Sequence, residues 1–312
     1  MILPHYSLKS NARRSVPDTE RAGGAISTAN RGSATLEEIA ATSASKIRAE
    51  NFPVALRLLP SGPRDRLTRL YAYARFVDDV GDTAAGDRRA LLDRVDAEVR
   101  ALWGAPATVR IPAVAGLRPL IDACGVPAEP FLDLIAANRV DQETSRYASF
   151  DDLLGYCRLS AAPVGRVVLY IAAAATPANV ADSDAVCAAL QVLEHCQDVG
   201  EDARAGRVYL PAEDLEAAGV GDADLLAPTT SPGLRRAVAV QVGRCDELLG
   251  AGRDLIGRLS GWPRVAVSGY LGGGLATADA LRAARFRVLE RTVRPSRLRT
   301  VAHAARLTVR PE

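Results

Sequence analysis

Two acidic clusters combine the residue types and the spacing needed to bind a divalent cation. The sequence reads DDVGD at 78–82 and DVGED at 198–202. On a helix, residues four apart project from one face, so each cluster presents a pair of carboxylates: Asp78 with Asp82, and Asp198 with Asp202. Like charges at this spacing destabilise a helix by roughly a few tenths of a kcal/mol, which favours a functional reason for them. Two facing pairs could hold Mg²⁺ against the phosphates of a substrate, because hard cations bind carboxylate and phosphate oxygens together.

The first cluster lies at the C-terminal end of the predicted helix whose apolar pattern is the clearest. Apolar side chains recur at the spacing of one helical face, at Leu67, Leu70, Tyr71 and Ala74. At 100° per residue, Asp78 and Asp82 fall within about 60° of Leu67. A surface helix places its charges opposite the apolar face. These carboxylates are therefore predicted to point into the interior.

The second cluster lies in a predicted helix over 182–204. Its apolar residues occupy one side, and a polar stripe runs elsewhere: Gln191, Glu194, His195, Asp198 and Asp202. Periodicity alone leaves open whether this stripe faces water or the interior. The inward direction of the first cluster favours the interior for the second.

Further helical patterns and their separators predict an all-α fold. Helices are expected at approximately 35–59, 87–103, 113–123, 128–142, 150–175, 233–259 and 264–293. Proline and glycine separate them, and the abundance of alanine and leucine favours helix. We predict a single-domain helical bundle over 35–293 with a central cavity, preceded by a disordered leader (1–34) and followed by a basic tail (294–312).

Composition and charge narrow the class of function. The net charge of the 312 residues is +2, which gives no general case for a nucleic-acid partner. From Arg282 to Glu312 there are nine arginines and two glutamates, so this end could attract phosphate or an anionic membrane surface; a solvated basic tail explains it equally well. The longest apolar run, Val167 to Ala175, is too short to span a bilayer.

The expected location is cytoplasmic. The five cysteines form no C-x-x-C pair, which is typical of reduced thiols, and no secretory signal precedes the first predicted helix. Any membrane contact would then be peripheral, at the inner face.

A diphosphate site also needs cations and a dry pocket. The candidate cations are Arg75, Arg158, Arg166 and Arg207, each of which could instead be an ordinary ion-pair partner. Arg75 is favoured because it precedes Asp78 by three residues and shares its face. His195 beside Cys196 is weak evidence for zinc, and no G-x-S-x-G or phosphate-loop lysine is present. Aromatic side chains near the clusters could stabilise a cationic intermediate or pack the core.

These residues resemble the squalene/phytoene synthase family, all-α enzymes of prenyl diphosphates. The matching stretches are YARFVDDVGD within 71–82, YCR through PVG at 156–165, QDVGED at 197–202 and GRVYLP at 206–211. The resemblance implies Mg²⁺ bound by the four aspartates and diphosphate contacts from Arg75 and Arg207. It also gives the other substrate-binding candidates: Phe52, Tyr71, Arg158, Gln197 and Tyr209.

Within the family, ENFPVA at 50–55 resembles the hydroxysqualene synthases of the bacterial hopanoid pathway. Squalene and phytoene synthases carry a Tyr, where this chain has Arg158 or Leu159, that is implicated in joining two prenyl diphosphates. Its absence implies a substrate that is already coupled: presqualene diphosphate, made by a sister enzyme and converted to hydroxysqualene for a downstream oxidoreductase.

Two alternatives stay open: a full squalene or phytoene synthase, and a non-catalytic lipid-binding or assembly subunit. The family usually has Asn where this chain has Glu194, four residues before Asp198. Glu194 is either an extra metal ligand or a source of repulsion that weakens the site.

Overall fold

The computed structural model describes residues 36–49, 59–104 and 106–309, and these residues form helices joined by loops. The first half contains α1 (Leu36–Ala49), α3 (Ser61–Thr83), α4 (Arg88–Gly104), η1 (Pro106–Thr108), α5 (Pro112–Ala115), α6 (Arg118–Cys124), α7 (Glu129–Glu143), α8 (Phe150–Ser160) and α9 (Ala162–Ile171). The second half contains α10 (Pro177–Gln197), α11 (Val199–Arg204), α12 (Ala212–Ala217), α13 (Asp222–Leu225), α14 (Pro232–Arg258), α15 (Gly261–Ala283) and α16 (Arg297–Val309). Within these ranges the all-α prediction is confirmed.

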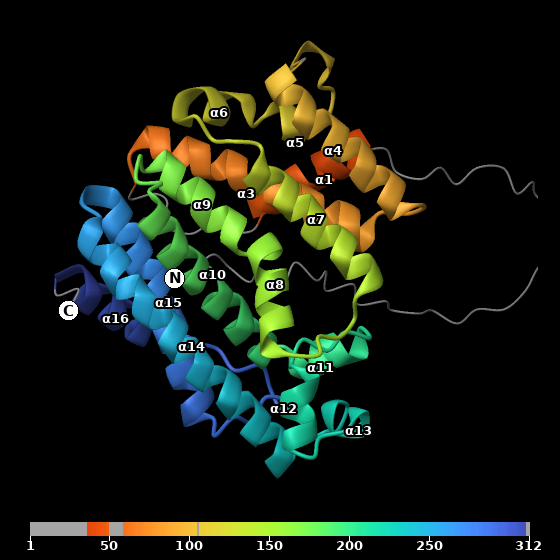
Figure 1. Ribbon diagram of the computed structural model, residues 1–312, viewed down its shortest axis with the longest axis vertical. Coiled ribbons are helices and arrows are strands. Elements are labelled where there is room, and N and C mark those ends of the chain that lie inside the picture. Colours follow the sequence, from red (N-terminus) through yellow and green to blue (C-terminus); the bar gives the residue numbers. More distant parts are fainter. Residues whose placement is uncertain (1–35, 50–58, 105, 310–312) are drawn as a thin grey trace, which may run out of the picture.

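Two clusters of buried side chains hold the bundle together. One joins α1, α3, α4, α7 and the short helices α5 and α6, and the other joins α8, α10, α14, α15 and α16. Helix α9 contributes to both, with Leu169 in the second cluster and Val167 and Val168 in the first. Figure 1 shows α9 and α10 running between α3 and α7 on one side and α14 and α15 on the other. A cavity lies between these two clusters of buried side chains.

Three helices predicted as continuous are each divided: the one over 113–123 is α5 and α6, and the divisions of the other two lie next to candidate site residues. The predicted helix over 150–175 is two helices that meet at Ala161, because Pro163 at the start of α9 has no N–H to donate. The predicted helix over 182–204 breaks at Asp198, where φ is −106° and ψ is 13°. The backbone bonds from Asp198 to Glu194 and from Asp202 to Asp198 persist across this break, so the acidic row keeps its helical spacing.

The C-terminal segment corrects the prediction of a basic tail after residue 293. Residues 297–309 form α16, which packs along α15 with Thr300 and Leu307 buried. Gly272 of α15 makes this close packing possible, because a Cβ there would lie 2.7 Å from the backbone nitrogen of Ala304.

The expected leader (1–34) and Phe52 lie outside the described residues. Among the helices that are described, none combines the length and apolar character needed to cross a bilayer.

Candidate active site

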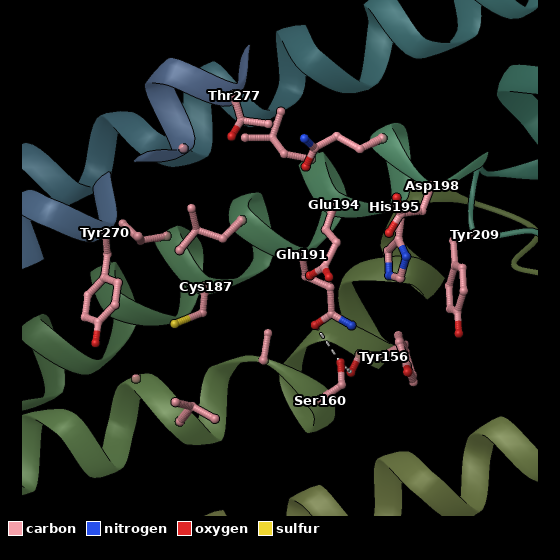
Figure 2. A pocket seen from close by; sticks show the side chains of 18 of the residues that line it. Tyr156, Ser160, Cys187, Gln191, Glu194, His195, Asp198, Tyr209, Tyr270 and Thr277 are labelled. Carbon is pink, nitrogen blue, oxygen red and sulfur yellow. Dashed lines mark hydrogen bonds between the residues drawn. The ribbon is translucent and has the colours of Figure 1, made fainter. Parts of the chain in front are cut away.

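The cavity between the two clusters of buried side chains has a volume of about 590 Å³. One end is polar, and its wall includes both aspartate pairs. The other end is lined mainly by apolar side chains of α9, α10, α14 and α15, such as Val168, Leu190 and Val267. In Figure 2, Cys187 and Tyr270 lie at the end opposite His195 and Tyr209. The cavity could therefore hold an amphiphile with an anionic head and a long hydrocarbon chain.

On the first side of the polar end, α7 holds the carboxylates of α3 in place. Asn138 donates its side-chain amide to Asp78 Oδ1 at 3.1 Å, and Gln142 donates to the carbonyl oxygen of Gly81 at 3.1 Å. Gly81 is required here because a Cβ at this position would overlap the Asn138 amide. Asp78, Asp82 and Asn138 all line the cavity.

On the opposite side, α10 and α11 present the polar stripe to the cavity. Its members all line the cavity, which confirms the inward direction: Gln191, Glu194, His195, Asp198 and Asp202. Ser160 donates to Gln191 Oε1 at 2.8 Å, as drawn in Figure 2. His195 stacks on Tyr209 with ring centroids 3.7 Å apart, and its Nδ1 lies 3.7 Å from Asp202 Oδ2.

The chain after α11 carries Arg207 into the site. This loop is fastened to the segment after α7 by the backbone bond from Val208 N–H to the Ser145 carbonyl oxygen, 2.8 Å long. Arg207 then donates through Nη2 to Asp82 Oδ1 at 2.9 Å. One cation thus links the loop of the second acidic cluster to the helix of the first.

A tyrosine cluster surrounds Asp141 beside the polar end. The Tyr156 hydroxyl donates to Asp141 Oδ2 at 2.7 Å, and the Tyr209 hydroxyl donates to Asp141 Oδ1 at 3.4 Å. The Tyr147 ring stacks on that of Tyr209 at a centroid distance of 5.9 Å. Asp141, Tyr156 and Tyr209 line the cavity, so aromatic faces border the region in which charge would develop.

Burial disfavours the charged forms of two carboxyls at this end, Asp78 and Asp141. Burial raises the pKa of Asp78 to about 8, an effect that Asp82 and Asp141 reinforce and the Asn138 hydrogen bond opposes. Burial also raises the pKa of Asp141, although the Tyr156 hydrogen bond lowers it in part. A cation bound nearby would favour the charged form of both carboxyls.

The donor set of the polar end fits a hard divalent cation. Mg²⁺ is typically bound by one or two carboxylates together with the phosphates of a substrate, and four aspartates share this cavity. Across the described residues, however, no three acidic, His or Cys side chains are placed to hold a metal ion by themselves. Ligands from a substrate would have to complete the coordination.

Several predicted site residues do not line the cavity. Arg75 is buried, and its Nε lies 3.4 Å from Asp79 Oδ2, which also accepts a 2.6 Å hydrogen bond from Ser43 of α1. Tyr71 is buried in α3 outside the cavity wall, and Arg158 is exposed on α8.

Arg166 is likewise engaged elsewhere, in a 2.7 Å ion pair with Asp184. By contrast Gln197 does line the cavity, and its amide donates to the Val293 carbonyl oxygen.

Sequence reasoning missed several cavity residues. Asn138 and Asp141 follow Leu134 at the i, i+4, i+7 spacing, so the pattern of one inward face was present in the predicted helix over 128–142. Arg294 and Arg297 also line the cavity; sequence analysis identified them only as part of a basic end that could bind phosphate or a membrane surface or be a solvated tail.

A helical bundle around a cavity with carboxylates at one end and an apolar wall beyond defines the isoprenoid-synthase class of protein. A family model described as "Squalene/phytoene synthase" matches residues 46–299. The chain therefore belongs to the squalene/phytoene synthase family, and it is an enzyme of the kind that processes prenyl diphosphates.

Individual relatives agree with this assignment. The chain is 38% identical over 221 residues to a hydroxysqualene synthase of Rhodopseudomonas palustris, covering 69% of this chain and 75% of the relative. It is similar to the solved structure of squalene synthase HpnC from Alicyclobacillus acidocaldarius, with a TM-score of 0.73, 37% identity, and coverage of 80% of this chain and 95% of that one. A dehydrosqualene synthase structure matches with a TM-score of 0.75 at 21% identity, over 88% of this chain and 96% of the other, which shows the shared fold.

Proposed function

We propose that this enzyme converts presqualene diphosphate to hydroxysqualene in a magnesium-dependent reaction that releases diphosphate. The observation that carries the proposal is a single cavity with two aspartate pairs at one end and an apolar wall at the other. The diphosphate would occupy the first end and the hydrocarbon the second. Similarity to hydroxysqualene synthases supports this substrate over other prenyl diphosphates.

The residues of the polar end would bind and orient the leaving group. Asp78, Asp82, Asp198 and Asp202 are the proposed ligands, with phosphate oxygens bridging the two pairs, and Glu194 is an additional candidate. Bound magnesium would supply the positive charge that stabilises the departing diphosphate. Arg207, already directed at this end by its bond to Asp82, can exchange that contact for a charge-assisted bond to a phosphate oxygen.

The reaction begins and ends with a change in a C–O bond, and between them the C–C bonds of a cyclopropane ring rearrange. The C–O bond to diphosphate breaks, its electron pair leaves with the diphosphate, and a cyclopropylcarbinyl cation remains. The apolar wall shields the cation from bulk water while its ring C–C bonds break and re-form, and the Tyr156 ring, which lines the cavity, can stabilise the positive charge. Water then forms a new C–O bond and releases a proton, which balances the conversion as presqualene diphosphate plus water to hydroxysqualene plus diphosphate.

The runner-up is a squalene or phytoene synthase that also performs the coupling step. A chloroplastic phytoene synthase of Zea mays is 33% identical over 187 residues, but the match covers only 43% of that protein. Against this reading, the chain has Arg158 and Leu159 where coupling enzymes of the family carry a Tyr, and Arg158 is exposed.

A substrate panel tests the proposal directly. Purified protein and Mg²⁺ are incubated separately with presqualene, farnesyl and geranylgeranyl diphosphate, and the extracted lipids are identified by mass spectrometry. Hydroxysqualene is expected from presqualene diphosphate alone. Ample product from farnesyl diphosphate by itself would overturn the choice of substrate.

The same assay addresses the non-catalytic alternative. Turnover by the wild type that disappears in Asp78→Ala and Asp198→Ala, with both variants still folded, would contradict an assembly role. An inactive wild type that binds a partner synthase would favour it.

A further inference from the structure

Helix α16 presents an apolar stripe on its outer face that is exposed among the described residues. Leu298, Val301 and Val309 are 83%, 63% and 77% exposed, and Ala302 and Ala305 between them are exposed as well. At 100° per residue all five fall within about 60° of Leu298. The opposite face of α16, with Thr300 and Leu307, is the one buried against the bundle. The outer face of α16 is therefore a continuous apolar strip.

Arginines flank this strip on both sides. Arg299 and Arg306 lie about 80–100° from Leu298 on one flank, and Arg297 lies about 100° away on the other. The helix contains no Asp or Glu. An apolar centre with arginines on both edges matches the boundary between lipid chains and headgroups, because the aliphatic stems can lie on apolar surface while the guanidinium groups reach phosphate.

The strip also borders the opening of the cavity. Val301 is 63% exposed and at the same time lines the cavity, together with Arg294, Pro295 and Arg297. Figure 1 shows α16 beside α15, a helix that forms part of the apolar end. A molecule entering or leaving past Val301 would pass the exposed face of α16.

We propose that the outer face of α16 docks the enzyme on an anionic membrane surface, with the cavity opening against the lipid. This inference rests on the proposed function. The proposed substrate has a long hydrocarbon chain and the product is apolar, so both partition into bilayers, and docking would bring the cavity to them. Three exposed apolar side chains insert between the headgroups, and the flanking arginines bind lipid phosphates. The occupant of this face is thus a lipid surface.

Vesicle flotation of the full-length protein tests the docking. Vesicles of phosphatidylcholine alone are compared with vesicles of equal parts phosphatidylcholine and phosphatidylglycerol. The wild type is expected to bind the anionic vesicles more tightly, and increasing salt should weaken that binding. The double variant Leu298→Ser/Val309→Ser should lose affinity by about tenfold or more, because two inserted side chains are removed.

Two further variants separate charge from hydrophobicity. Arg299→Gln/Arg306→Gln should lose about tenfold on anionic vesicles and little on neutral ones. The matched control is Leu226→Ser/Val240→Ser, which removes side chains that are 56% and 45% exposed, one in the turn after α13 and one on α14, and should leave vesicle binding unchanged. Circular dichroism and gel filtration check that each variant keeps its fold and size.

Turnover distinguishes failure of docking from failure of the proposed reaction. With presqualene diphosphate in detergent micelles, Leu298→Ser/Val309→Ser should match the wild type; with the substrate in anionic vesicles it should be slower. Equal vesicle binding by the wild type and this variant would overturn the docking. So would a wild type that is a dimer and binds no vesicles, if the double substitution makes it a monomer, because the outer face of α16 would then contact a second copy of the chain. Absence of turnover in micelles by the wild type would instead overturn the proposed reaction, since vesicle binding is measured without substrate.

Discussion

Arg207 and Asp82 are 125 residues apart in the chain, yet the guanidinium donates to the carboxylate at 2.9 Å across the polar end of the cavity. Asp82 belongs to the first acidic cluster, and Arg207 follows the second by a single loop. The side chain of Asp82 is 24% exposed and that of Arg207 is 22% exposed, so a diphosphate can reach both. This ion pair is the most direct link between the two clusters.

Replacing Arg207 should therefore damage the chemical step more than substrate binding. Arg207→Gln removes a charge-assisted donor that would strengthen as the diphosphate leaves, and we expect kcat to fall by about a hundredfold. Steady-state kinetics check this, with Arg89→Gln as the control, because Arg89 pairs with Glu143 at an exposed position. Equal loss in both variants would contradict a specific role for Arg207.

Gly81 should tolerate no side chain. In Gly81→Ala the new methyl group overlaps the Asn138 amide and displaces the partner of Asp78, so we expect a destabilised protein with activity reduced by about tenfold or more. Gly62→Ala is the matched control at the start of the same helix, where a Cβ meets nothing within 4 Å. Thermal unfolding and turnover of the two variants give the comparison. Wild-type behaviour in Gly81→Ala would show that α3 and α7 are not held together in this way.

The Asp141 carboxyl provides a test of pH dependence. Burial raises its pKa in the folded state, so the folded protein binds the proton more tightly than the unfolded chain does. The resulting stability is complete below the unfolded pKa, near about 3.9, and is lost as the pH rises through the raised folded pKa. Asp141→Asn abolishes this loss while leaving an acceptor for the Tyr156 hydroxyl. The melting temperature of the variant relative to the wild type should thus be higher at about pH 8 than at about pH 4. A difference that does not change with pH would contradict the raised pKa.

The rate at which the Cys187 thiol is alkylated can test whether the apolar end of the cavity binds hydrocarbon. Cys187 lines the wall there, and burial raises its pKa to about 12, so alkylation should be slow at neutral pH and faster as the pH rises. A bound prenyl diphosphate analogue with Mg²⁺ should slow this alkylation further, because the hydrocarbon would cover the thiol. Cys124, a partly exposed cysteine outside the cavity wall, is the internal control in the same mass-spectrometric experiment. Protection of both thiols, or of neither, would contradict a hydrocarbon site at this end.

Much of the site could be read from residue spacing. The apolar pattern of α3 placed Asp78 and Asp82 inside, and the family motifs identified Asp198, Asp202 and Arg207, all of which line one cavity. Spacing within a single helix was sufficient because a rigid helix fixes the direction of each side chain.

The missed residues depended on contacts between elements. Arg75 shares a helix face with Asp78, but it pairs with Asp79, whose carboxylate also accepts a hydrogen bond from Ser43 of α1, a contact that the spacing in α3 does not reveal. The basic composition of the C-terminal segment fitted both a solvated tail and a phosphate- or membrane-binding segment, and it did not reveal that Thr300 and Leu307 are buried against the bundle. In both cases the outcome depended on tertiary contacts that the spacing within one helix does not contain.

The proposed function requires that the two aspartate pairs, Asp78 with Asp82 and Asp198 with Asp202, bind one diphosphate through magnesium. The most direct measurement is a crystal structure of the protein with Mg²⁺ and a non-hydrolysable farnesyl thiodiphosphate. We expect metal ions between the diphosphate and the carboxylates of the four aspartates, Arg207 on a phosphate oxygen, and the hydrocarbon running toward Cys187. A diphosphate bound elsewhere, with either aspartate pair free of metal, would contradict the proposed function.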